Sequence, residues 1–427
     1  MTDEGNSRRT RWTPPARPEW VRKFNEEGAW LDLAGIVPLD EQSLLDTARK
    51  NTGLNDFGAD DWHEPFKVLI KSLDEEADLS PIGRMMTRGE ILMYLEGRLR
   101  IEDAFRRHPE IAAEEITNPL LIVGQGRSGT TYLYELMAMD PANRSPMTWE
   151  WLFPLLPENA DPAFEAEKRK IADRRITLWN RVTPEFEACH RFIGEQPCET
   201  IYTQVPSFQC AVSMGTLGQA PSYNAYMAKL GMEPGLRYEK RVLQAMQWRE
   251  RGQGRKRRWV LKSPDHLRDL PQVLKVYPDM GFIWMHRDPV KALASMVNLI
   301  GNMLWIKSDR LLPEGAYDNL TDATQMAAQM SKPIEWIENG ALKADQLCNV
   351  QYLDLVADPV ATLARIYDCF GLEFGVEARQ IIGDFVANNP REKRRPQNYT
   401  VGEKAIIDSE RKAFRKYQEY FQVPDEI

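Results

Sequence analysis

The segment PLLIVGQGRSGTTYLYELMAMDP, residues 119–141, constrains the fold more than any other part of the chain. Its apolar run at 120–123 predicts a buried strand, and the glycine-bearing stretch GQGRSGTT at 124–131 follows directly. The amphipathic residues that come next predict a helix. In this order, successive backbone N–H groups and a helix N-terminus point at one place, which suits a phosphate. The segment therefore predicts a phosphate-binding loop between a strand and a helix.

The spacing of this loop is G-x-x-x-x-G-T-T, which matches a nucleotide-binding Walker A loop except at one position. Thr130 stands where that loop carries a lysine, and a basic residue, Arg127, lies three positions earlier. A nucleoside triphosphatase needs the lysine on the β- and γ-phosphates. The loop therefore suits a phosphate ester and is poorly suited to ATP hydrolysis. A P-loop small-molecule kinase is the alternative enzyme.

Three more short apolar runs lie far downstream, and stretches of helical character separate them. They are RWVLKSP at 258–264, GFIWMHRDP at 281–289 and NVQYLDL at 349–355. Alternating strands and helices predict parallel βαβ units, with a ligand site at the carboxyl ends of the strands. We therefore expect an α/β fold with a P-loop-type parallel sheet flanked by helices.

The rest of the chain is predicted to be largely helical. Thr87 and Glu90 form a capping-box pattern, which predicts a helix start at Thr87. The block between the loop helix and the second strand is helix-rich and aromatic, so we interpret it as an insertion that covers the acceptor site. We divide the chain into a disordered tail (1–17), a helical N-terminal region (18–115) and a P-loop domain (116–427), with the helix-rich insertion at 140–257.

Two phosphate motifs together resemble a known family. The strand–G-x-x-R-S-G-T-T–helix segment resembles the 5′-phosphosulfate loop of sulfotransferases that use 3′-phosphoadenosine 5′-phosphosulfate (PAPS). MHRDPVKALAS is similar to their 3′-phosphate motif, with Arg287 at a strand end and Ser295 eight residues later. WVLKSPDHL, at 259–267, matches the position of their strand-end Lys/His segment, and KRRPQNYT, at 393–400, resembles their basic closing loop. The resemblance covers roughly residues 40–400 and includes the helical N-terminal region of the bacterial branch.

The resemblance implies transfer of a sulfuryl group from PAPS to a hydroxyl of a small acceptor. The many aromatic residues of the insertion favour an apolar acceptor, because some of them are expected to line the mouth of the site. The products would be a sulfate ester and adenosine 3′,5′-bisphosphate. It also implies the residues that bind the nucleotide: Gly126, Arg127, Ser128, Gly129, Thr130, Thr131, Arg287, Ser295, Arg394 and Arg395. Sulfuryl transfer needs no metal, and no His, Cys or carboxylate set has metal-ligand spacing.

Arg127 and Lys262 are the candidates for stabilising charge in the reaction. The acceptor hydroxyl must also lose a proton to a base. Glu150 matches the position of the glutamate base in family members that use a carboxylate. It lies between Trp149 and Trp151, and two indoles would desolvate the carboxylate and raise its pKa. Glu150 is therefore the favoured base.

Two histidines compete with Glu150 for this role. His266 lies two residues beyond the position of the histidine in other family members. His190, with Glu195 and Glu199 nearby in the sequence, is the third candidate. We assign His190, together with Trp149, to binding the acceptor, so the sequence leaves the choice between Glu150 and a histidine open.

Charge and composition limit the partners. The chain has 55 Lys and Arg against 63 Asp and Glu, a net charge of −8, which is the opposite of a nucleic-acid binder. The five cysteines form no C-x-x-C pair, which is typical of reduced thiols in the cytoplasm. No secretory signal and no transmembrane run are expected. Both a monomer and a homo-oligomer remain open, as does a non-catalytic nucleotide-binding protein that has lost its base.

Overall fold

The computed structural model describes residues 12–157, 160–190, 192–251, 257–311, 322–389 and 403–427. The tail expected at 1–17 lies mostly outside these residues. The part that is described, 12–17, forms no helix or strand, but it packs on the molecule. Arg17 makes an ion pair of 2.6 Å with Asp309, and Trp12 lies beside Trp305 with their ring centroids 6.1 Å apart.

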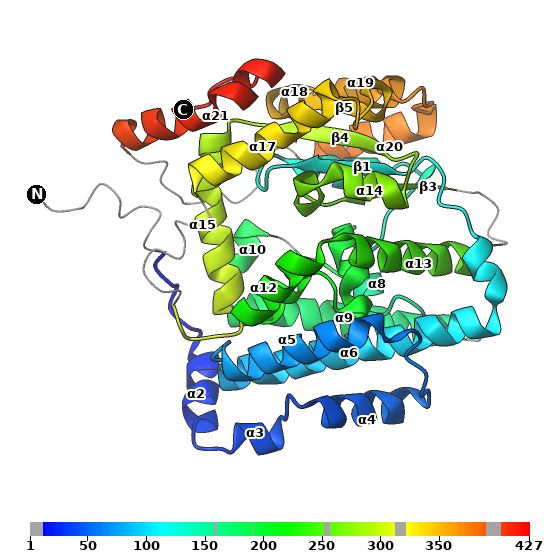
Figure 1. Ribbon diagram of the computed structural model, residues 1–427, viewed down its shortest axis with the longest axis vertical. Helices are drawn as coiled ribbons and strands as arrows, with labels where there is room; N and C mark the ends of the chain where they lie inside the picture. Colours follow the sequence, from blue (N-terminus) through cyan, green and yellow to red (C-terminus); the bar gives the residue numbers. More distant parts are fainter. Residues whose placement is uncertain (1–11, 158–159, 191, 252–256, 312–321, 390–402) are drawn as a thin grey trace, which may run out of the picture.

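The fold contains a sheet of five parallel strands in the order β2-β3-β1-β4-β5, which lies in the upper half of Figure 1. The strands are β1 (Leu120–Gly124), β2 (Asn143–Arg144), β3 (Arg258–Lys262), β4 (Gly281–His286) and β5 (Leu347–Gln351). All strands run the same way, so the segments that follow β1, β3, β4 and β5 meet at one edge of the sheet. This confirms the predicted α/β fold.

Helices cover both faces of the sheet. Leu121 and Val123 of β1 belong to one apolar core, and Leu120 and Ile122 belong to the other, because successive side chains of a strand point to opposite faces. The first core is completed by α13 (Glu233–Arg249), α14 (Leu270–Val276), α17 (Ala323–Glu338) and α21 (Lys404–Phe421). The second is completed by α7 (Thr130–Ala138), α19 (Pro359–Cys369) and α20 (Val376–Asn388). The continuous apolar character of these strands follows from burial on both sides.

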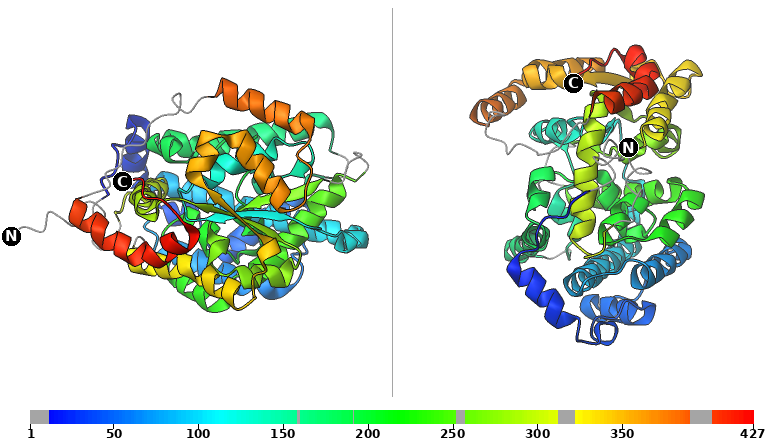
Figure 2. Two further views of the ribbon diagram at one scale, coloured as in Figure 1. Left: turned by 90° about the horizontal axis from the view of Figure 1, so that it is seen from above. Right: turned by 90° about the vertical axis from the view of Figure 1, so that its left-hand side faces the viewer.

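The N-terminal helices and the insertion share a third apolar core, in the lower half of Figure 1. The N-terminal helices are α2 (Glu19–Gly28), α3 (Leu33–Ile36), α4 (Glu41–Thr52), α5 (His63–Glu75) and α6 (Pro81–Arg107). The insertion contributes α8 (Thr148–Leu152), α9 (Pro162–Val182), α10 (Glu185–Cys189), α11 (Ala211–Met214) and α12 (Pro221–Leu230), and it ends with α13. The helical N-terminal region and the helix-rich insertion are both confirmed. Figure 2 shows the two sets of helices packed together from two further directions.

The helix start predicted at Thr87 is wrong. Helix α6 begins six residues earlier, at Pro81, where the side chain of Ser80 accepts a hydrogen bond of 3.2 Å from the amide of Gly83. Thr87 lies inside the helix, and its hydroxyl donates to the carbonyl of Leu217 at 2.8 Å. A serine followed by proline is a strong start signal, because Pro fits the first helical position.

The strand ends also differ in part from the sequence pattern. The run at 349–355 is only half strand, since β5 ends at Gln351 and α18 (Tyr352–Ala357) begins at the next residue. The two-residue strand β2 was not expected from the sequence, because so short a segment carries no periodicity. The other three predicted strands lie where the apolar runs placed them.

Helix α15 (Pro289–Trp305) joins the two halves of the molecule, running from the edge of the sheet to the N-terminal helices (Figure 1). Just beyond it, the buried amine of Lys307 makes an ion pair of 2.6 Å with Glu90 of α6. A Cβ atom on Gly83 would lie only 1.8 Å from the carbonyl oxygen of Lys307. The chain just after α15, the helix that carries Ser295, is therefore packed backbone to backbone against α6.

The close contact between Gly83 and the backbone of Lys307 predicts that a glycine-to-alanine change destabilises the protein at residue 83, although alanine normally stabilises a helix. We expect Gly83→Ala to lower the free energy of unfolding by about 2–3 kcal/mol, because the added carbon meets a backbone carbonyl that cannot move aside. Gly89→Ala in the same helix is the matched control. Its Cβ would meet only the flexible end of Arg175, at 3.2 Å, so the gain in helix propensity of about 0.5–1 kcal/mol should dominate. Urea unfolding measures both, and equal effects would contradict the packing.

Candidate active site

The loop between β1 and α7 forms a cradle for an anion. Arg127 and Gly129 have φ angles of +74° and +94°, so the backbone turns back on itself before the helix begins. A Cβ on Gly129 would lie 2.6 Å from the ring of Tyr352, which only glycine avoids. The buried hydroxyl of Ser128 has no hydrogen-bond partner among the described residues. The first N–H groups of α7 have none within the helix either, by the geometry of every helix start. These features fit a bound phosphate.

Three of the predicted phosphate residues, Arg127, Arg287 and Ser295, meet at this loop. The guanidinium of Arg127 donates from Nε to the hydroxyl of Ser295 at 3.0 Å, and from Nη1 to the carbonyl of Cys189 at 2.7 Å. Arg287 donates from Nη1 to the backbone carbonyl of Arg127 at 2.9 Å, and its guanidinium lies 4.1 Å from the ring centre of Tyr352. The loop after β1, the end of β4 and helix α15 are thus connected by direct side-chain contacts.

Lys262, the last residue of β3, lies at the same edge of the sheet. It is buried and makes an ion pair with the carboxylate of Glu199, which precedes the short helix η4 (Thr200–Ser207). His190 follows α10. Burial lowers its pKa to about 4, with the charges of Lys262 and Arg127 adding to the effect and Glu199 opposing it. Arg127, Glu199 and Lys262 thus lie within electrostatic range of His190, and we call these three residues together with His190 the site cluster.

Sequence reasoning placed Glu199 only as a neighbour of His190. The available signal was indirect: a lysine at the end of a buried strand needs a carboxylate partner. The sequence offers many carboxylates, and the chosen one lies 63 positions away along the chain.

Glu150 is buried in α8, and its contacts are structural. Its carboxylate makes an ion pair with Arg144 and accepts a hydrogen bond of 2.8 Å from the amide of Met147, which caps the start of its own helix. Arg144 also pairs with Glu250 at 2.8 Å. Burial lowers the pKa of Arg144, but these two carboxylates more than offset it, so the pKa is raised. Trp149 is buried as well, with Arg169 4.3 Å from its ring centre.

His266 belongs to a buried polar network instead of the site cluster. Its Nδ1 lies 2.5 Å from the hydroxyl of Ser263, and its Nε2 lies 3.5 Å from the side-chain nitrogen of Gln204. Gln204 and the hydroxyl of Tyr277 both donate to Glu239, at 2.9 and 3.1 Å. Burial lowers the pKa of His266 to about 3 and raises that of Glu239 to about 7. This network joins β3 to α13 and η4.

The two arginines predicted in the basic closing loop cannot be placed relative to the site. Arg394 and Arg395 lie outside the described residues.

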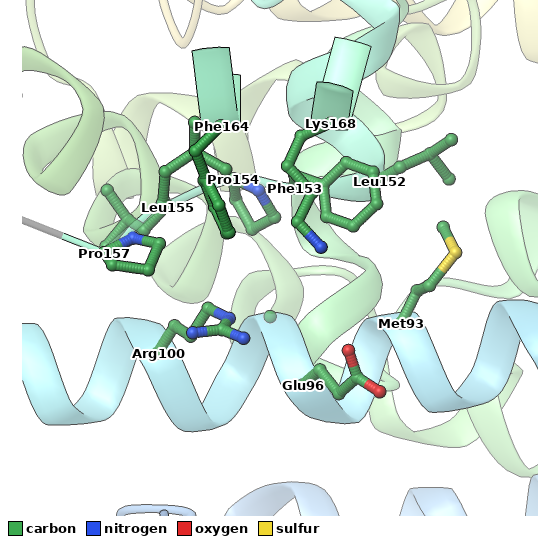
Figure 3. Close-up of a pocket in the computed structure, with 12 residues that line it drawn as sticks. Met93, Glu96, Arg100, Leu152, Phe153, Pro154, Leu155, Pro157, Phe164 and Lys168 are labelled. Carbon is green, nitrogen blue, oxygen red and sulfur yellow. The ribbon is translucent and has the colours of Figure 1, made fainter. Parts of the chain in front are cut away.

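A pocket between α6 and the segment after α8 is shown in Figure 3, with Glu96, Arg100 and Lys168 among its lining residues. Its free volume of about 10 Å³ admits roughly one water molecule, which is too little for a nucleotide. Within the described ranges, no group of three or more His, Cys, Asp or Glu could hold a metal ion.

None of the helices in the described part of the chain combines the length and the apolar character needed to cross a bilayer.

Residues 119–375 match the model of the sulfotransferase family, and the chain belongs to that family. A curated relative, omega-hydroxy-beta-dihydromenaquinone-9 sulfotransferase Stf3 of Mycobacterium tuberculosis, is 25% identical over 303 residues. The alignment covers 68% of this chain and 72% of the relative, and Stf3 of Mycobacterium bovis gives the same values. The resemblance expected from the two phosphate motifs is confirmed at the level of the family.

Two solved structures share the fold over most of the chain. Sulfotransferase STF1 of Mycobacterium tuberculosis H37Rv is 26% identical, with a TM-score of 0.68, covering 88% of this chain and 98% of its own. Sulfotransferase STF9 of Mycobacterium avium, at 24% identity, has a TM-score of 0.74 and covers 90% of this chain and 97% of its own. The helical N-terminal region is therefore part of the shared fold.

The ion pair between Lys262 and Glu199 predicts that substitutions of these two residues have non-additive effects on the free energy of unfolding. Lys262→Met leaves a carboxylate largely buried without its partner, so we expect the free energy of unfolding to fall by about 3 kcal/mol. Adding Glu199→Gln should restore most of that loss. Lys275→Met is the control, because Lys275 is well exposed and its contact with Glu233 is 3.9 Å long. Urea unfolding of wild type, Lys262→Met, Glu199→Gln, the double variant and Lys275→Met tests this, and additive losses in the double variant would contradict it.

Proposed function

We propose that this protein transfers a sulfuryl group from PAPS to a hydroxyl of a small, apolar acceptor. A sulfate ester and adenosine 3′,5′-bisphosphate would be the products. One observation carries the proposal: Arg287 binds the backbone of the loop at Arg127, while Arg127 binds Ser295. Two basic residues and a hydroxyl from three separate segments thus surround one anion-binding edge. That arrangement supports a nucleotide with phosphates on both its 5′ and 3′ positions.

In this proposal, each part of the nucleotide has its own residues. The loop from Gly126 to Thr131 and the guanidinium of Arg127 hold the 5′-phosphosulfate. Arg287 and Ser295 hold the 3′-phosphate, and Arg394 and Arg395 are expected to add positive charge there. The positive charge of Lys262 stabilises the phosphate oxygen that keeps the electron pair when its bond to sulfur breaks. The pairing of Lys262 with Glu199 keeps the amine oriented at the strand end.

The contacts favour His190 over Glu150 and His266 as the base. Burial keeps His190 neutral at pH 7, so one ring nitrogen can accept the proton of the hydroxyl. A bound anionic donor adds negative charge nearby and raises the pKa of His190 towards neutrality, which makes it a stronger base. The carboxylate of Glu150 is held by Arg144, and His266 is held in a buried network. We assign structural roles to both.

Aromatic rings around His190 support an apolar acceptor. Its ring centroid lies 4.4 Å from that of Phe192 and 6.1 Å from that of Phe186. Tyr202 lies 5.9 Å from Phe192 by the same measure. The relative Stf3 is named for a hydroxylated menaquinone-type acceptor, which is an apolar alcohol. All five cysteines are free thiols, which supports a cytoplasmic location.

A direct test is incubation of the purified protein with PAPS and a panel of apolar alcohols and phenols. Mass spectrometry should detect the sulfate ester together with one adenosine 3′,5′-bisphosphate per ester formed. If no alcohol or phenol is sulfated while an amine is, the acceptor class is wrong. If ATP with magnesium yields phosphorylated products instead, the reaction class is wrong.

Arg287 should discriminate between nucleotides. We expect Arg287→Ala to weaken binding of adenosine 3′,5′-bisphosphate about 100-fold but of adenosine 5′-monophosphate less than threefold, because only the first carries the 3′-phosphate. Calorimetric titration measures both affinities. Arg365→Ala is the matched control, since Arg365 is exposed and pairs with Asp354 at 2.9 Å. Equal losses for the two nucleotides would contradict the assignment.

The base can be identified from kinetics and pH. We expect His190→Asn to lower kcat about 10²- to 10⁴-fold, whereas Glu150→Gln and His266→Asn keep kcat within about threefold in the folded protein. With the pKa of His190 lowered to about 4, kcat/KM should fall only as the pH drops through 4. The acid limb of kcat should lie at higher pH, because the bound donor raises that pKa. A large loss of kcat in Glu150→Gln alone would make Glu150 the base.

A further inference from the structure

The segment after α21, residues 423–427, lies against the start of α15, near the C label in Figure 1. The carboxylate of Glu426 accepts from Nε of Arg287 at 2.8 Å and from Nη2 at 3.2 Å. Its second oxygen also pairs with the amine of Lys291 at 3.0 Å. Glu426 is largely buried, with 8% of its side chain exposed. An acidic side chain thus covers one edge of the arginine assigned to the 3′-phosphate.

Lys291 belongs to the same binding surface by helical geometry. Lys291 and Ser295 lie four residues apart in α15, so their side chains share one face of the helix, and Arg287 lies two residues before the helix begins. A phosphate held between Arg287 and Ser295 would therefore lie within reach of Lys291. Glu426 joins the two cations of this surface in one salt-bridge network.

The segment is anchored by contacts that do not involve the proposed phosphate residues. The amide of Glu426 donates to Asp288 at 2.8 Å, and Arg411 of α21 pairs with Asp288 at 3.2 Å and also with Asp425. Gln418 donates to Asp425 at 2.9 Å. A groove of about 560 Å³ runs beside the segment and is lined by residues of α21 together with Val423, Pro424 and Asp425.

The carboxylate of Glu426 and a bound 3′-phosphate repel each other electrostatically. Burial alone would raise the pKa of Glu426, but Arg287 and Lys291 lower it below its usual value, so the carboxylate is charged at neutral pH. A phosphate monoester carries about −1.5 to −2 charges at pH 7. Two anions that share one arginine repel each other strongly in a site of low dielectric. The carboxylate and the 3′-phosphate therefore compete for Arg287 and Lys291.

We propose that Glu426 is an acidic latch that occupies Arg287 and Lys291 until the 3′-phosphate of the nucleotide displaces it. Lys291 then becomes a contact of that phosphate. The inference rests on the proposed function, because it takes Arg287 as the 3′-phosphate residue. The latch makes the 3′-phosphate the group that opens the site, so nucleotides without it gain nothing from displacing Glu426.

Calorimetric titration of wild type and Glu426→Gln with two nucleotides tests the latch. The amide side chain still accepts a hydrogen bond from Arg287, so the variant should fold. We expect it to bind adenosine 3′,5′-bisphosphate about tenfold more tightly than wild type, with adenosine 5′-monophosphate changed less than twofold. Glu419→Gln is the control, because it removes the same charge from an exposed position on α21. This control should change neither affinity by more than twofold.

Other results of these titrations would overturn the latch alone or the latch together with the proposed function. If Glu426→Gln binds the bisphosphate more weakly, Glu426 orients Arg287 and the latch is wrong, and equal changes for both nucleotides overturn it as well. If wild type and Glu426→Gln bind the bisphosphate equally, the latch alone fails and the proposed function stands. If both proteins bind no bisphosphate, the proposed function fails and the latch with it.

Two further measurements address displacement itself. Lys291→Met should lose about five- to tenfold in affinity for the bisphosphate in the Glu426→Gln background, where Lys291 no longer has its carboxylate. Hydrogen exchange at the amide of Glu426, which donates to Asp288, should become faster when the bisphosphate binds wild type. Slower exchange at that amide would show that the segment closes over the nucleotide, which contradicts displacement.

Discussion

The hydrogen bond from Arg287 to the backbone of the loop at Arg127 connects the parts of this molecule that must act together. Arg287 comes from the end of β4, whereas Arg127 lies between β1 and α7 and reaches on to Ser295 in α15. A parallel sheet brings the ends of its strands to one edge, but it does not by itself fix the side chains there. This link sets the distance between the two predicted phosphate subsites.

The helical half of the protein positions further residues at the same edge of the sheet. Helix α15 carries Ser295 and ends at Trp305, and just beyond it Lys307 forms a buried ion pair with Glu90 and lies close to Gly83, which fixes this end of the segment against α6. The insertion supplies His190 and Glu199 to the site cluster from the other side. The position of the site therefore depends on three apolar cores packed against one another.

The strand-loop-helix segment at 119–141 and two of the other strands could be predicted from local signals, because each depends on a few consecutive residues. Local signals do not show which other side chain a charged residue pairs with in the folded protein. Glu150 has the sequence neighbours expected of a base, but those neighbours do not indicate that its carboxylate forms a buried pair with Arg144, six residues before it. Lys262 and Glu199 are 63 residues apart, and Arg287 and Glu426 are 139 apart, so no pattern in the sequence could pair them. The start of α6 was missed for another reason: Thr87 and Glu90 imitate a cap inside a helix that begins at Pro81.

The most direct measurement is a pair of calorimetric titrations of the wild-type protein, first with adenosine 3′,5′-bisphosphate and then with ATP and magnesium. The structure predicts binding of the bisphosphate with a dissociation constant of about micromolar order and no response to ATP. Heat from ATP and magnesium with none from the bisphosphate would contradict the account, because it would place a triphosphate in a loop that holds Thr130 in place of the lysine.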